Sequence, residues 1–189
     1  MNESPFVSPH EVEGRRILHE AIGRFVVGFE LVIAELRGAC RLMLERGGLG
    51  IKNQPLASIV LARLGAAELT EATGAMYREF CPTDADGASE LGRVLKRVDR
   101  LREERNRIIH SPWVFDLADR ENRSDPFAYS ITFDRSRTIG QTVREARFRP
   151  SDFDRLTTEA TTLQVYGIRL CYCINQSGFS LANELRRPV

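Results

Sequence analysis

Apolar residues recur at steps of three and four over most of the chain, and this spacing predicts amphipathic helices. The first such stretch forms a single apolar stripe made of Leu18, Ile22, Phe25, Phe29, Val32, Leu36, Cys40 and Met43. Ser8 is its expected N-cap, with Pro9 in the first turn and Glu11 completing a capping box. The glycine pair at 47–48 is the expected end of this long helix.

A second helix is predicted from Asn53, with Pro55 just inside it, and it continues without a break to Phe80. The segment from Pro82 to Gly87 is typical of a loop. The sequence therefore predicts one helix for the whole apolar pattern from Asn53 to Phe80.

The third predicted helix begins near Ser89, and its apolar face consists of Leu91, Val94, Leu95, Val98, Leu101 and Ile109. Arg105 falls in the middle of that face, while Asn106 and His110 lie at its edge. Ser111 precedes a proline, which disfavours helical backbone, so the helix should end there.

The pattern then changes to short extended segments, predicted at 113–115, 127–133 and 143–148, with a polar loop between the first two. A last helix is predicted with Ser151 as its N-cap and Asp154 closing a capping box. Its apolar residues are Leu156, Leu163, Tyr166, Ile168 and Leu170, and it ends around Asn175. The sequence therefore predicts one all-α domain over residues 1–189, a bundle of four to five helices. A small β-hairpin-like insertion, about 112–149, separates helices three and four.

Composition adds modest limits. A chain of 189 residues with 42% hydrophobic content can bury one core, and its net charge of +1 indicates no overall attraction to nucleic acid or membrane. The basic residues are 25 arginines and two lysines, a bias typical of a GC-rich genome. Four cysteines lack zinc-site spacing, no uncharged apolar run could span a bilayer, and no signal peptide begins the chain. We expect a cytoplasmic, soluble protein with reduced thiols and no metal.

Common catalytic signatures are absent from the sequence: it has no phosphate-binding G-x-x-x-x-G-K-[ST] loop, no H-E-x-x-H pair and no nucleophile elbow. The remaining candidate is Arg105-Asn106 followed by His110 at a helix end. An inward-facing guanidinium needs a partner or a function, because burying it unpaired is costly. A purely structural alternative stays open, in which Arg105 pairs with a carboxylate of the first helix and His110 caps the third.

Arg105-Asn106-x-x-x-His110 resembles the R-x(4–6)-H motif of the HEPN superfamily, including the polar residue after the arginine. The Ser-x-Trp that follows, the extended segments and the final helix are similar to bacterial single-domain members. The resemblance implies an all-helical HEPN-type bundle that acts as a metal-independent endoribonuclease, without cofactors and as a homodimer. Such proteins are often toxins with a cognate antitoxin protein, or phage-defence effectors. Other members are inactive and bind nucleotides or proteins, which is the alternative reading of this chain.

The resemblance also implies roles for single residues. His110 would exchange a proton with RNA, and Arg105 would stabilise charge on the phosphorane. Asn106 would orient either His110 or the phosphate by hydrogen bonding. The products would be a 2′,3′-cyclic phosphate and a 5′-hydroxyl. Ser111 and Glu30 are supporting candidates, although Glu30 at the margin of the first stripe is more commonly a solvated ion-pair partner.

Charge along the third helix gives weak support for RNA. From Arg93 to Arg107 the chain has seven basic residues and three acidic ones. Arg102 and Arg107 are the candidate RNA contacts. The same charge would serve a helical regulator that binds DNA, a third hypothesis from another functional class. The chain has no recognisable helix-turn-helix for that role.

Overall fold

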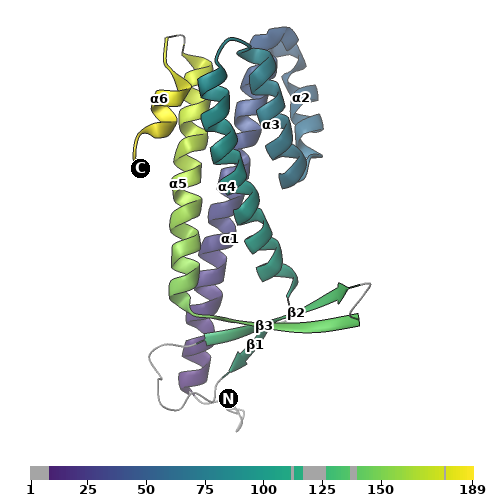
Figure 1. Cartoon of the computed structure of the whole chain (residues 1–189), viewed down its shortest axis with the longest axis vertical. Coiled ribbons are helices and arrows are strands. Elements are labelled where there is room, and N and C mark those ends of the chain that lie inside the picture. Colours follow the sequence, from purple (N-terminus) through teal and green to yellow (C-terminus); the bar gives the residue numbers. More distant parts are fainter. Residues whose placement is uncertain (1–8, 112, 117–126, 137–139, 177) are drawn as a thin grey trace. The chain divides into compact units, whose positions relative to one another are not determined.

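The computed structural model describes residues 9–111, 113–116, 127–136, 140–176 and 178–189 of the chain. Most of them are helical, as the sequence predicts (Figure 1). The helices are α1 (Pro9–Leu44), α2 (Gln54–Ala62), α3 (Ala66–Phe80), α4 (Ala85–His110), α5 (Pro150–Asn175) and α6 (Leu181–Arg186). A π-helical turn η1 (Glu45–Leu49) and a 3₁₀ turn η2 (Ile51–Asn53) join α1 to α2. The strands are β1 (Trp113–Asp116), β2 (Phe127–Ser136) and β3 (Gly140–Phe148).

The chain divides into two compact units, which we describe separately. Unit 1 comprises Met1–Val27 and Glu104–Thr157, and unit 2 comprises Gly28–Glu103 and Thr158–Val189. Unit 1 therefore holds the first half of α1, the last turns of α4, the strands and the start of α5. Unit 2 holds α2, α3 and α6 together with the rest of α1, α4 and α5. The prediction of a single domain stays a prediction.

The predicted stripe of α1 is buried except at Ile22, which is half-buried. Phe25, Val32 and Cys40 are at most 1% exposed, and α1 runs without interruption through its glycines. Glycine at position 28 allows close packing against α5, because a Cβ at that position would lie only 3.3 Å from the Ala160 Cβ. Beyond Leu44 the chain enters η1, where Gly48 adopts φ 106°, a value that glycine reaches without strain. The expected cap at Ser8 lies outside the described residues.

The single helix predicted from Asn53 to Phe80 is wrong, because the structure contains two helices there. α2 ends at Ala62, and α3 begins at Ala66 after Gly65, whose backbone is extended (φ −70°, ψ 175°). Apolar periodicity continues across the break, since Leu61 and Leu69 are both buried. Periodicity alone therefore could not reveal it.

α4 begins four residues earlier than the predicted Ser89. Asp84 accepts a hydrogen bond from the Gly87 amide (2.9 Å) through Oδ1, and through Oδ2 it accepts one from the Tyr77 hydroxyl (2.7 Å). The carboxylate satisfies one of the unpaired amides at the start of the helix. Gly87 therefore belongs to the first turn of α4 and not to a loop.

The apolar face of α4 ends on Ile108, not on the predicted Ile109. Ile108 is fully buried and Ile109 is 41% exposed. Seven residues from Leu101 make almost two helical turns, which returns Ile108 to the buried side, and one more residue rotates Ile109 away by about 100°. α4 ends at His110, as predicted.

The three strands of unit 1 lie where the sequence predicts extended segments. They form an antiparallel sheet in the order β1-β2-β3. Trp113 of β1 lies opposite Ser130 of β2, and Ala128 of β2 lies opposite Phe148 of β3. Most of the predicted loop between the first two strands lies outside the described residues.

α5 begins at Pro150, and its first turn is capped differently from the prediction. The Asp152 carboxylate accepts from the Arg149 amide at 2.9 Å, so Arg149 and Asp152 make the contact assigned to Ser151 and Asp154. Along the helix Leu156, Leu163 and Leu170 are buried as predicted, but Ile168 is 48% exposed.

The short helix α6 has no counterpart in the prediction. Arg169 of α5 donates to the backbone carbonyls of Glu184, Arg187 and Pro188. These bonds hold the C-terminal segment against α5. Six helices, rather than four to five, are therefore present among the described residues.

Candidate functional site

The candidate site lies at the C-terminal end of α4, within unit 1. Arg105 and Asn106 are half-buried, His110 is exposed, and Ser111 is buried directly after the helix. Arg105 continues the buried face that includes Leu101 and Ile108, as the sequence predicts for an inward-facing arginine.

Arg105 and Asn106 are brought together. The Arg105 Nη1 donates to the Asn106 Oδ1 over 3.3 Å. A guanidinium can only donate, so the amide must present its oxygen to Arg105. The Asn106 Nδ2 is left as a donor for another acceptor, such as a phosphate oxygen or a neutral imidazole nitrogen.

His110 shares a face of α4 with Asn106 and not with Arg105. Residues four apart lie on one side of a helix, whereas residues five apart differ by about 140°. Asn106 therefore contacts Arg105 and lies one helical turn before His110 on the same face of α4. The sequence predicts Asn106 as a catalytic residue together with Arg105 and His110, and the structure adds its contact with Arg105.

The end of α4 is fixed by an aromatic side chain. The Trp113 Nε1 donates to the Ile108 carbonyl at 2.7 Å. That carbonyl is one of the last four of the helix, which have no partner within it. The indole thus closes the turn that carries His110.

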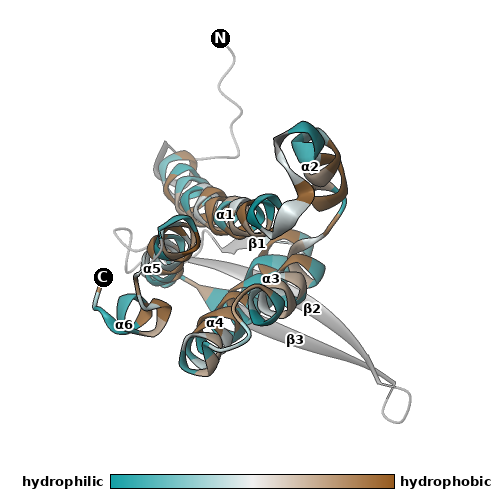
Figure 2. Cartoon of the chain, turned by 90° about the horizontal axis from the view of Figure 1, so that it is seen from above, coloured by the Kyte–Doolittle hydropathy of each residue, from teal (hydrophilic) through white to brown (hydrophobic). Residues whose placement is uncertain are grey.

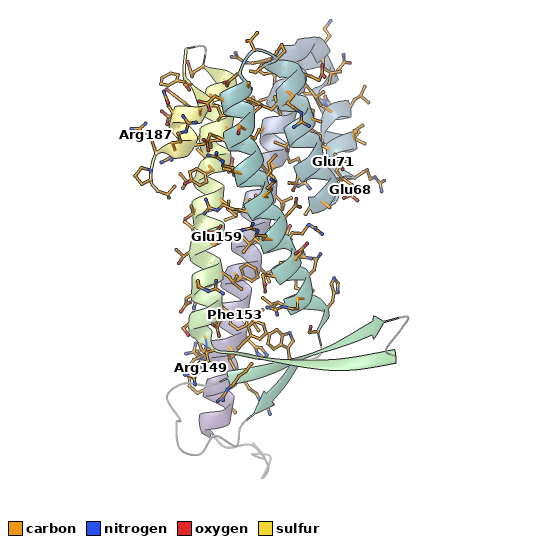
Figure 3. The ribbon with its side chains drawn as sticks, in the orientation of Figure 1. Glu68, Glu71, Arg149, Phe153, Glu159 and Arg187 are labelled. Atoms are coloured by element: carbon orange, nitrogen blue, oxygen red, sulfur yellow. The ribbon has the colours of Figure 1, made fainter. Side chains whose placement is uncertain are left out.

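Two phenylalanine rings hold this indole in place. Trp113 meets Phe148 edge-on at 5.5 Å and Phe153 at 6.0 Å, and the two phenylalanine rings stack at 5.6 Å. Phe153 is fully buried in the first turns of α5 (Figure 3). We call Trp113, Phe148 and Phe153 the aromatic clamp. The sequence places Trp113 in an extended segment without a role at the site, and the signal for that role is its position three residues after the helix end.

The remaining candidates differ in where they lie. Glu30 is exposed and belongs to unit 2, so its supporting role stays a prediction. Arg102 also belongs to unit 2, and it contacts the carboxylates of Asp99 (3.4 Å) and Glu103 (3.9 Å). Arg107 forms an ion pair with Glu104 and lies over the Phe148 ring at 5.0 Å.

The excess positive charge expected along α4 is largely neutralised. Four of the seven basic residues meet carboxylates: Arg93 with Glu90, Arg97 with Glu159, Arg102 with Asp99, and Arg107 with Glu104. Glu90 lies before the segment from Arg93 to Arg107, and Glu159 lies on α5, where Figure 3 labels it. Neither is among the three acidic residues of that segment. A basic face for RNA or DNA is therefore weaker than the sequence suggests. The Glu159 carboxylate, which accepts two hydrogen bonds, raises the pKa of Arg97.

Other chemistry in the described part of the chain is limited. The four cysteines are free thiols, and burial raises the pKa of Cys171 to about 11. No cluster of three metal-binding side chains occurs among these residues. None of the described helices has both the length and the apolar character needed to cross a membrane.

No protein-family profile, curated protein or solved structure matches this chain. The HEPN resemblance therefore depends on the motif and on the order of the elements.

Proposed function

We propose that this protein is a metal-independent endoribonuclease of HEPN type, with its active site at the C-terminal end of α4. One observation carries the proposal: Arg105 faces inward and is linked to Asn106, and Asn106 shares its helix face with the exposed His110. The three groups form a short polar series on an end of the helix that the aromatic clamp holds rigid. In this proposal the sheet between α4 and α5 is the insertion of an otherwise helical HEPN-type bundle.

The chemistry requires two proton transfers and one charge stabilisation. The ribose 2′-oxygen attacks the adjacent phosphorus and loses its proton to a base, and the P–O5′ bond breaks as the 5′-oxygen gains a proton. His110 performs one of these transfers. In a homodimer the second copy of the motif would perform the other. The products are a 2′,3′-cyclic phosphate and a 5′-hydroxyl.

Arg105 has a specific electrostatic task in this scheme. The C-terminal end of a helix carries partial negative charge, which disfavours an approaching phosphate. A guanidinium at this end offsets that repulsion and stabilises the additional charge on the phosphorane. The Asn106 Nδ2 then donates to a phosphate oxygen or holds the imidazole of His110.

Cellular role follows from the same family resemblance. Cleavage of RNA in the cytoplasm would arrest growth, so we propose a toxin or a phage-defence effector, controlled in the first case by an antitoxin protein. Growth arrest on expression that Arg105→Ala relieves would support this role.

A second candidate function has its own support. The pairing of Arg93, Arg97 and Arg102 with carboxylates leaves little net charge on the middle of α4 for binding RNA. That arrangement suits a catalytically inactive HEPN-like module that binds a nucleotide or a protein as a dimer.

RNA cleavage in EDTA distinguishes the two candidates. The wild-type protein should cut RNA without metal, and His110→Ala should lower the rate by about 10²–10⁴-fold. His19→Ala is the matched control, because His19 is also an exposed helical histidine of unit 1. Absence of cleavage favours the inactive module, and cleavage that needs magnesium or survives His110→Ala contradicts the proposed mechanism.

A further inference from the structure

A small pocket in unit 2, between α1 and α2, combines positive charge with a hydroxyl. Its volume is about 280 Å³, and it is lined by Ala34, Arg37, Gly38, Arg41, Ser58 and Leu61. Two of these six residues are cationic and none is acidic. It contains no residue of the Arg105–His110 end.

The two arginines lie one turn apart on α1. Like charges four residues apart on a helix destabilise it by about 0.2–0.5 kcal/mol. Among the described residues, neither Arg37 nor Arg41 has a carboxylate within 4 Å, in contrast to the paired arginines of α4. This repulsion is therefore uncompensated by the protein itself.

Arg37 is held in position by the protein. Its Nε donates to the Leu61 carbonyl at 3.3 Å, near the end of α2, and the side chain is half-buried. This bond occupies the inner edge of the guanidinium, so the terminal nitrogens are the groups available to a ligand. Arg41 is exposed and forms the outer side of the pocket.

The opposite wall adds no negative charge. α2 has no ionisable residue between Gln54 and Ala62, and Figure 2 shows that much of its surface is apolar. Ser58 contributes an exposed hydroxyl from this wall. The pocket therefore presents two guanidinium groups and one hydroxyl donor with no competing carboxylate.

We propose that this pocket binds a phosphate monoester, carried either by a free nucleotide or by the 5′ end of an RNA. A phosphate monoester is close to doubly charged near neutral pH and has three terminal oxygens that accept hydrogen bonds. Guanidinium groups match such oxygens bidentately. Pockets for drug-sized ligands span roughly 300–1,000 Å³, so this one accommodates a phosphate with a small attached group. The inference is independent of the proposed ribonuclease activity.

Calorimetric titration with AMP tests the proposal, with adenosine as the uncharged comparison. AMP should bind to the wild type and adenosine should not. Arg41→Gln should weaken AMP binding by about 10–100-fold, because one charge-assisted interaction is removed. Arg100→Gln is the control, since Arg100 is an exposed helical arginine without an acidic partner among the described residues. Arg41 is preferred to Arg37, whose substitution would also remove the bond to Leu61.

A second pair of ligands identifies the source of the phosphate. A short 2′-O-methyl oligonucleotide, which lacks the nucleophile for cleavage, is compared with and without a 5′-phosphate. Binding of AMP alone assigns the pocket to a free nucleotide, and preference for the phosphorylated oligonucleotide assigns it to RNA ends. The proposal is overturned if neither AMP nor the phosphorylated oligonucleotide binds, if adenosine binds as well as AMP, or if Arg41→Gln binds like the wild type. Catalytic failure of the Arg105–His110 end would change none of these results.

Discussion

The arginines in the middle of α4 and at its C-terminal end have different hydrogen-bond partners. In the middle, Arg97 meets the Glu159 carboxylate with two hydrogen bonds of 2.8 and 2.9 Å. At the end, Arg105 donates to the neutral amide of Asn106, and the helix terminus is closed by the Trp113 indole. The same residue type therefore meets a carboxylate of α5 in one region and an amide of its own helix in the other.

The difference shows that a count of charges does not identify a binding surface. Partially exposed ion pairs contribute little to stability, but they cancel the field that would attract a phosphate backbone. The partners of the α4 arginines are mostly carboxylates of the same helix. Only Arg97 among these ion pairs has its partner, Glu159, on another helix.

Removing the centre of the aromatic clamp should have the largest effect on the end of α4. Phe153 is fully buried, so Phe153→Ala should lower the free energy of unfolding by about 3–5 kcal/mol. Phe179→Ala is the matched control, because Phe179 is 49% exposed and should cost about 1 kcal/mol through its contact with Tyr172. Chemical denaturation measures both. Equal losses would mean that the clamp does not anchor this end.

A smaller effect is expected when only the indole hydrogen bond is removed. Trp113→Phe keeps an aromatic ring but leaves the Ile108 carbonyl without its donor, which should cost about 1 kcal/mol. Amide hydrogen exchange should then quicken about five-fold in the last turn of α4 and remain unchanged in the middle of α5. Unchanged exchange at the end of α4 would contradict the role given to Trp113.

The ion pair in the middle of α4 should matter least. Arg97→Gln should lower stability by about 0–1 kcal/mol, because both partners are about one third exposed. A double-mutant cycle with Glu159→Gln measures the coupling between the two side chains. RNA cleavage should be unaffected. A marked loss of cleavage in Arg97→Gln would instead place functional charge in this region.

The sequence was informative where local periodicity and core packing agree. The stripe of α1 and the end of α4 before Pro112 were predicted because both follow from helix geometry and backbone sterics. The break at Gly65 was missed because apolar spacing continues through it. The start of α4 differs from the prediction because the Asp84 side chain caps the helix, whereas glycine at position 87 favours a loop when only the sequence is considered.

The candidate site was predictable in its residues but not in its contacts. The inward position of Arg105 follows from the face that also includes Leu101 and Ile108. The bond from Trp113 to Ile108 and the pairing of Arg97 with Glu159 join segments whose proximity depends on the tertiary fold. No spacing rule along one helix could reveal either contact.

The most direct test compares Arg105→Gln with Arg102→Gln, two arginines of one helix with different partners. The value of kcat/KM for RNA cleavage in EDTA should fall about 10²–10³-fold in Arg105→Gln, because a donor that stabilises the phosphorane is lost. In Arg102→Gln, where the side chain already meets Asp99 and Glu103, it should change less than about three-fold. Equal losses in the two variants, or a larger loss in Arg102→Gln, would contradict the assignment of catalysis to the end of α4.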